Sequence, residues 1–245
     1  MTAQHEIDDP RRKLLVRALS AGLLYGTLSP AQALTFGLLG SKPSKLPDSQ
    51  SIYRLSGDVK VNARAANLDT RIRPGDAVQT GKNSEIVFVV GGNSMILRED
   101  SELNLDPPPA SVSSLLIGGL RLLTGKLLSV SHNSAMRVTS STATIGIRGT
   151  GFYIEADPEQ TYFCNCYGVT DIEASNDPQS RETLTATNHG RPVYILASGS
   201  SGGRIRSAPF INHTDQELAL IETLVGRERP FVFPRRTYTA PRRTY

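Results

Sequence analysis

The sequence of 245 residues predicts an all-β domain, a β-roll or sandwich of short strands with one short C-terminal helix. Apolar or alternating segments of about four to six residues recur, and turn residues separate them every 8–12 residues or so. Residues 145–153 hold three glycines among β-branched and aromatic residues. Glycine at this density marks bulges or close backbone approach in strands, and it disfavours helices by about 1 kcal/mol per residue. This segment therefore predicts a sharply bent strand.

The first 33 residues (1–33) predict an export signal. Arg11 and Arg12 begin a basic segment that precedes an apolar run, and Ala31-Gln32-Ala33 provides a cleavage pattern. The run of about 11 residues is too short for a bilayer, which needs about 20. The paired arginines look like a twin-arginine signal; a general secretory signal and an uncleaved anchor are the alternatives. We expect the mature chain to begin near Leu34 and to be periplasmic or secreted.

Residues 34–50 are rich in Gly, Ser, Pro and Lys and predict a linker to a β domain at 51–200. Strands are expected within this domain wherever apolar or alternating segments end at Gly, Pro or Asn. In its first half these segments are 52–55, 57–62, 74–81, 85–90, 94–98 and 102–105. In its second half they are 113–116, 118–130, 136–139, the glycine-rich segment, 161–167, 169–174, 181–187 and 193–196.

Residues 201–228 predict a loop and a docked amphipathic helix. Thr214 and Glu217 form a capping box, and Gly226 is a stop signal. The residues with helical spacing that form the apolar face are Leu218, Ile221, Leu224 and Val225. Residues 229–245 repeat the sequence Arg-Arg-Thr-Tyr and predict a disordered basic tail. The net charge of +4 is concentrated at the two ends, so the charge of the middle does not indicate a nucleic-acid partner.

The order of these segments resembles the FecR-type domain family, the periplasmic sensor and anchor modules of bacterial cell-surface signalling. The resemblance extends from about residue 53 to residue 172. Its signature residues in the glycine-rich segment are Gly146, Arg148, Gly149, Thr150 and Phe152. The resemblance implies a non-enzymatic module whose partner is another envelope protein or a ligand.

The chain departs from the family at its N-terminal side. FecR-type regulators carry a cytoplasmic helical domain that binds a sigma factor, followed by a membrane span. Here the first 50 or so residues contain the signal instead. We therefore expect no sigma-factor partner and no transmembrane span in the mature chain.

Cys164 and Cys166 are the two cysteines of the chain, and they lie in a strand pattern. Residues two apart in a strand face the same side, with Cα atoms about 6.6 Å apart, near the upper limit for a disulfide. His189, in a turn, and His213, before the helix, would complete a ligand set for Zn²⁺ or copper. Three interpretations stay open: small buried side chains, metal ligands, or a disulfide or redox pair. Each histidine alone could also bond to backbone.

The sequence motifs of known enzyme classes are absent or lack a residue or element that their chemistry needs. Ser201 lies in a Gly-x-Ser-x-Gly match, but no helical pattern follows it and no acid lies between Ser201 and His213. His132 lies in an expected hairpin turn, where polar residues are common for local reasons. There is no P-loop and no HExxH motif. The first hypothesis is an exported non-catalytic module for protein or ligand binding in envelope signalling. The alternative is a metal-binding or redox protein that uses the four Cys and His residues, and a hydrolase is the third.

Overall fold

The structure is a computed structural model that describes residues 43–108, 116–131 and 135–227. The expected signal at 1–33, the tail at 229–245 and His132 lie outside the described residues, as does most of the expected strand at 113–116. The described part is all-β, as predicted, with 14 strands and the single helix α2 (Asp215–Leu224). No helix within these ranges is long and apolar enough to cross a membrane.

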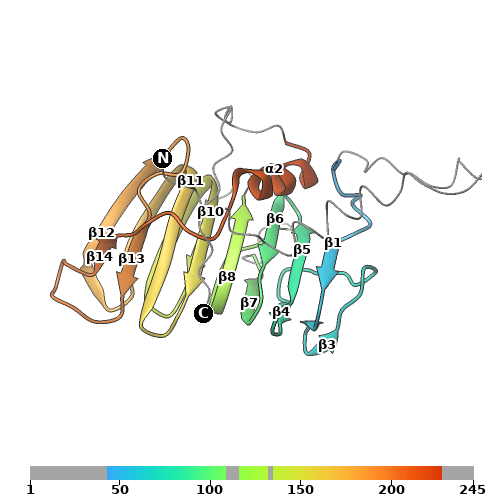
Figure 1. The fold of residues 1–245 in the computed structure, drawn as a ribbon, viewed down its shortest axis with the longest axis horizontal. Coiled ribbons are helices and arrows are strands. Elements are labelled where there is room, and N and C mark those ends of the chain that lie inside the picture. The colour runs from blue at the N-terminus through green and yellow to red at the C-terminus, as the bar shows by residue number, and fades with distance from the viewer. Residues whose placement is uncertain (1–42, 109–115, 132–134, 228–245) are drawn as a thin grey trace, which may run out of the picture. The chain divides into compact units, whose positions relative to one another are not determined.

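The 14 strands form one branched, hydrogen-bonded sheet (Figure 1). They are β1 (Ile52–Ser56), β2 (Val59–Val61), β3 (Arg64–Ala65), β4 (Ala77–Thr80), β5 (Glu85–Val90), β6 (Asn93–Leu97), β7 (Ser101–Asp106), β8 (Gly119–Val130), β9 (Ala135–Thr139), β10 (Ala143–Ala156), β11 (Gln160–Ala174), β12 (Asp177–Ala186), β13 (Val193–Leu196) and β14 (Ile205–Ser207). The bounds of β5 and β13 are those predicted from sequence. The short strands β3 and β14 were not predicted, and β11 is one strand where two were expected.

The three long strands β8, β10 and β11 each change neighbour along their length. The first half of β8 pairs with β7 and its second half with β6. The first half of β10 pairs with β9 and its second half with β8. The first residues of β11 pair with β13 and its last residues with β12. The long strands thus belong to two layers, and side chains from both layers meet in one core.

The predicted bend lies in β10, where its pairing moves from β9 to β8. The register with β11 shifts between Arg148 and Gly151 and again between Gly151 and Phe152. Gly149 has φ +58°, which favours glycine, and a Cβ on Gly151 would lie 2.4 Å from Cε1 of Tyr167. The glycine-rich signature is therefore required by backbone geometry and close packing at the bend.

The inner core fills the space between the layers. In the described residues it consists of aliphatic side chains, two methionines and three phenylalanines. Phe152 and Phe163 stack within it, with ring centroids 5.9 Å apart. These side chains are almost completely buried, which stabilises the fold by the removal of apolar surface from water.

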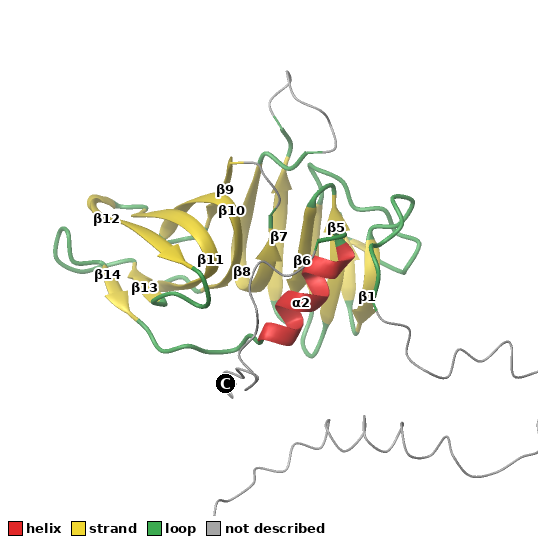
Figure 2. Cartoon of the chain, turned by 90° about the horizontal axis from the view of Figure 1, so that it is seen from above, coloured by secondary structure: helices red, strands yellow, loops and turns green. Residues whose placement is uncertain are grey.

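Helix α2 lies next to β6 and β8, on the face of these strands opposite the inner core (Figure 2). The expected capping box is present: Thr214 Oγ1 accepts from the Glu217 N–H at 3.2 Å, and Thr214 N–H donates to Glu217 Oε2 at 2.9 Å. Arg98, which directly follows β6, donates to Glu217 Oε1 at 2.9 Å.

We call the buried apolar residues of this helix, of the segment before it and of the strands beneath it the outer cluster. Its members are Val87, Ile96, Leu128, Val130, Tyr153, Tyr162, Cys164, Cys166, Tyr167, Ile211, Leu218, Ile221 and Leu224.

Candidate metal centre

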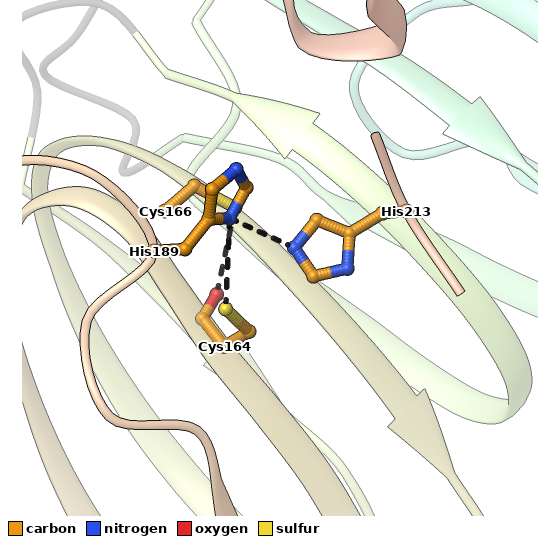
Figure 3. A group of neighbouring side chains, drawn as sticks. All are labelled: Cys164, Cys166, His189 and His213. Atoms are coloured by element: carbon orange, nitrogen blue, oxygen red, sulfur yellow. Dashed lines mark hydrogen bonds between the residues drawn. The ribbon is translucent and has the colours of Figure 1, made fainter. Parts of the chain in front are cut away.

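The two cysteines lie at an interruption of the pairing along β11. Phe163 pairs with Val193 of β13, whereas Gly168 pairs with Ala186 of β12. The turn at 187–192 fills the interval between these two strands. Cys164 and Cys166 share one face of β11, and this turn and the segment that precedes α2 bring His189 and His213 to that face (Figure 3).

His189 is held over the cysteines by the backbone of the turn. Its N–H donates to the Cys166 carbonyl at 2.7 Å, and the Gly190 N–H donates to the Asn165 carbonyl at 2.9 Å. The φ of His189 is +43°, in the left-handed region that residues other than glycine adopt infrequently. These two hydrogen bonds stabilise that backbone conformation and hold the turn against β11.

His213 approaches from the segment before α2. Its ring is stacked on the ring of Tyr153, with centroids 4.6 Å apart and planes at 20°. Phe210 contacts both histidines, with centroids 4.5 Å from His189 and 4.4 Å from His213. The histidine rings are thus positioned by aromatic packing as well as by hydrogen bonds.

All four residues predicted from sequence come together. Their ligand atoms lie within 4.8 Å of one another, with His189 Nδ1 3.2 Å from His213 Nε2 and 4.0 Å from Cys164 Sγ (Figure 3). A tetrahedral zinc ion with Zn–S near 2.3 Å and Zn–N near 2.0–2.1 Å needs ligand separations of roughly 3.3–3.8 Å. Contraction by about 1 Å or less would therefore give the four atoms this geometry.

The centre is closed to solvent. Cys164, Cys166 and His213 are 0% exposed, and the side chain of His189 is 5% exposed. Buried polar side chains are stable only when their hydrogen-bonding groups have partners. Each ring nitrogen of the two buried imidazoles therefore needs a hydrogen-bond partner or a metal ion.

The outer nitrogen of each imidazole has an acceptor. His189 Nε2 lies 2.7 Å from Asp215 Oδ1, and His213 Nδ1 lies 2.7 Å from the Ile211 carbonyl, which can only accept. When the outer nitrogens donate in these bonds, the inner nitrogens of the neutral rings carry lone pairs. These lone pairs face each other across 3.2 Å. With the outer nitrogens as donors, a proton or a metal ion between the inner nitrogens would remove this repulsion.

Electrostatics in the centre favour that positive charge. Burial alone lowers the pKa of His189, but hydrogen bonds to Cys164 and Asp215 outweigh it, and the net pKa is raised. Burial alone raises the pKa of Cys164, but contacts with Cys166, His189 and His213 outweigh it and hold the pKa well below its ordinary value. These shifts favour a thiolate at Cys164 and a protonated imidazole at His189, whereas burial and the neighbouring Cys164 raise the pKa of Cys166.

Other uses of the cysteines fit the geometry less well. Cys164 and Cys166 share a face of β11, as predicted, since both belong to the outer cluster. Their thiols are not joined in a disulfide. Cys164, His189 and Asp215 follow the order of nucleophile, base and orienting acid in a cysteine hydrolase. Complete burial of Cys164 denies a substrate access to the sulfur. The arrangement is better suited to hold an ion than to attack a carbonyl.

Other candidates from the sequence lie outside this centre. Ser201 donates to Asp177 Oδ1 at 3.1 Å, and the Gly202 N–H donates to Asp177 Oδ2 at 2.7 Å, which are contacts of a structural loop. The signature residue Phe152 belongs to the inner core, and Arg148 pairs with Asp171 on an exposed surface.

Asp215 is a residue of the centre that the sequence did not reveal. It lies between the capping residues Thr214 and Glu217, is 1% exposed and bonds to His189. Its place two residues after His213, in the first turn of an expected helix, was the available signal.

Comparisons with known proteins add little. No family model matches the chain, and a search of curated proteins found no match. The chain is similar to a crystal structure at 1.65 Å resolution of a proposed anti-sigma factor from Parabacteroides distasonis ATCC 8503. The identity is 12%, the TM-score is 0.42, and the match covers 62% of this chain and 76% of that one. A second such structure, at 2.50 Å, gives 11% identity, a TM-score of 0.43 and coverage of 60% and 73%. At these TM-scores the similarity supports no conclusion about function.

Proposed function

We propose that this protein is a non-catalytic module that holds one Zn²⁺ ion through Cys164, Cys166, His189 and His213. The observation that carries the proposal is the pair of inner imidazole nitrogens 3.2 Å apart, both of which have an acceptor at the opposite ring position. Histidine ligands of metals have this arrangement, because the outer N–H bond fixes the tautomer and aims the other nitrogen at the ion. Asp215 and the Ile211 carbonyl have that role here.

Charge favours zinc over copper in this environment. Two thiolates and two neutral imidazoles cancel the charge of Zn²⁺, whereas Cu⁺ would leave one negative charge in a buried cluster of aromatic rings. An uncompensated buried charge is costly, and the neighbouring Asp215 carboxylate would increase that cost. Cu²⁺ prefers a tetragonal arrangement to a tetrahedral one. Copper remains the alternative ion in the test below.

The role that we propose for the ion is structural. Four protein ligands complete a tetrahedral shell and leave no open position for a substrate, unlike the three ligands of catalytic zinc sites. The FecR-like order of strands and the bend at Gly149 and Gly151 support a module of the cell envelope that binds another envelope protein or a ligand. The signal-like sequence at 1–33 supports export to the periplasm or the medium.

Elemental analysis of protein purified without chelator tests the site, with a thiol titration alongside. We expect one zinc per chain, and on substitution with Co²⁺ the visible spectrum of a tetrahedral thiolate complex. Cys166→Ser and His213→Ala should lose the ion, whereas His132→Ala, a histidine outside the set, should retain it. With Zn²⁺ at a hundred times its dissociation constant, the wild type should gain about 2.7 kcal/mol of stability that Cys166→Ser does not gain.

Other results would contradict the proposal. Two free thiols without a metal would mean that the cysteines are only buried packing residues, whose replacement by serine costs about 1–2 kcal/mol each. No metal and no free thiols would mean a disulfide. Copper at one equivalent would retain the site and overturn the choice of ion.

A further inference from the structure

The residues of the centre come from two parts of the chain. Cys164, Cys166 and His189 belong to β11 and the turn beside it, whereas His213 and Asp215 belong to the segment that carries α2. We propose that metal occupancy controls the docking of residues 208–227 on the sheet. This inference rests on the proposed metal site. The ion would join the sheet to this segment through His213 and, through His189, to the Asp215 carboxylate.

The apolar contact of the segment comes from a short stretch of chain. Its buried members of the outer cluster are Ile211, Leu218, Ile221 and Leu224, and Ala208, Phe210, Leu220 and Val225 pack against the cluster in part. The helix has 10 residues, and isolated helices shorter than about 12–15 residues are marginal in water. The segment therefore depends on its contacts with the sheet to stay helical.

Docking also buries polar groups, whose desolvation opposes it. Glu222 is 1% exposed, accepts from Tyr167 and lies 2.6 Å from Arg227. Asp215, which is also 1% exposed, bonds to His189. Each buried carboxylate loses its hydration, so the net gain from docking is smaller than the buried apolar area suggests. A bound metal ion adds a favourable contribution that is made only in the docked state.

The inner core is independent of this segment. None of its described members lies in residues 208–227, and its contacts join the two strand layers directly. Release of the segment would thus leave the two layers folded. It would expose apolar side chains of β5, β6 and β8 that belong to the outer cluster, among them Val87, Ile96 and Leu128. The ion would therefore regulate whether this face is accessible.

Hydrogen–deuterium exchange of the full chain tests the coupling. Protein saturated with Zn²⁺ is compared with protein in excess chelator. We expect peptides from residues 208–227 to lose protection by about tenfold or more when the metal is removed, in the range of known couplings between sites. Peptides from β7 and from the first half of β10 should change little, because their core does not include the segment.

Zinc affinity gives a second measurement. If the segment is only partly docked without the ion, a variant that weakens docking further lowers the docked fraction and, in proportion to it, the apparent metal affinity. Ile221→Ala removes an apolar contact of α2 and leaves every ligand in place, so the zinc dissociation constant should rise several-fold. Ile145→Ala is the matched control, since it removes the same atoms from the inner core and should leave zinc affinity unchanged.

The two proposals fail in different ways. Zinc bound at one equivalent, with equal protection of residues 208–227 in both states, would overturn the coupling and leave the metal site intact. An unchanged zinc affinity in Ile221→Ala would also overturn it. No bound zinc in the wild type would overturn the metal site and the coupling together.

Discussion

The inner core and the outer cluster differ in chemistry although they lie on opposite faces of the same strands. In the described residues the inner core contains no tyrosine and no cysteine, whereas the outer cluster contains three tyrosines and both cysteines. Buried polar side chains contact the outer cluster: His213 stacks on Tyr153, and Glu222 accepts from Tyr167. The inner core is stabilised by apolar burial alone. The outer cluster depends also on partners for its polar groups.

This difference indicates which region specifies the fold and which responds to conditions. Apolar burial changes little with pH or metal concentration. Ionisable groups in a buried cluster link stability to both. Substitutions in the two regions should therefore differ in how much stability they remove and in whether that loss depends on pH or on metal.

Phe152→Ala should give the largest loss. Phe152 is 0% exposed and stacks on Phe163 in the inner core, and a Phe→Ala change in a core costs about 3–5 kcal/mol. Urea denaturation with and without Zn²⁺ measures the loss, which should be the same in both conditions. A loss that depends on metal would show that the two regions are not separate.

Glu222 should make the outer cluster sensitive to pH. Burial raises its pKa from 4.5 to about 7, although the nearby Arg227 opposes the shift. The native state therefore holds a proton between pH 4.5 and 7 that the unfolded chain has lost. This contribution to stability is full below about pH 4.5 and is lost as pH rises to 7, by up to about 3 kcal/mol.

The variant Glu222→Gln, which cannot ionise, isolates this contribution. The stability of the variant relative to the wild type should increase between pH 5 and pH 8, measured by urea denaturation in excess chelator. Other titrating groups cancel in that difference. If the difference is constant with pH, the outer cluster does not owe its pH sensitivity to this carboxyl.

Gly151→Ala should cost about 1–3 kcal/mol, as overpacked substitutions do. The new methyl group would displace the buried ring of Tyr167, whose hydroxyl bonds to Glu222 of α2. Gly149→Ala is the control, because nothing lies within 4 Å of its Cβ and only its φ of +58° is unfavourable. A double-mutant cycle with Tyr167→Val should recover part of the loss at Gly151 alone. Additive losses would contradict the steric account.

Arg148→Ala should have the smallest effect. Its side chain is 57% exposed and that of its partner Asp171 is 50% exposed, and exposed ion pairs contribute about 0–1 kcal/mol. Thermal denaturation should detect no change beyond that range. A larger loss would place this signature residue among those that stabilise the fold.

Local signals in the sequence were sufficient to predict much of the fold. Alternation and turn residues gave the bounds of β5 and β13, and the capping box at Thr214 and Glu217 gave the start of α2. The density of glycine gave the bend in β10. Strand β14 has no such signal, because its pairing with β13 depends on tertiary contact. Glycine at position 168 suggested a break in β11, but its φ of +93° is accommodated within one strand.

The four residues of the centre were suggested as a ligand set from residue type, as one of three open interpretations, and the way in which the fold brings them together was not predicted. Sequence spacing placed Cys164 and Cys166 on one face. It could not show that the turn after β12 places His189 over them. This placement depends on β11 pairing with β13 on one side of the cysteines and with β12 on the other. Nor could it show that Asp215, at the first turn of α2, would reach His189.

The order of the site residues along the chain has a consequence for biosynthesis. The thiols at positions 164 and 166 are made before His189, and His213 follows His189 by 24 residues. A growing chain therefore presents two thiols to its surroundings before the second imidazole and the covering helix exist. During that interval oxidants and competing thiols can reach the sulfur atoms, and the completed C-terminal segment ends their exposure.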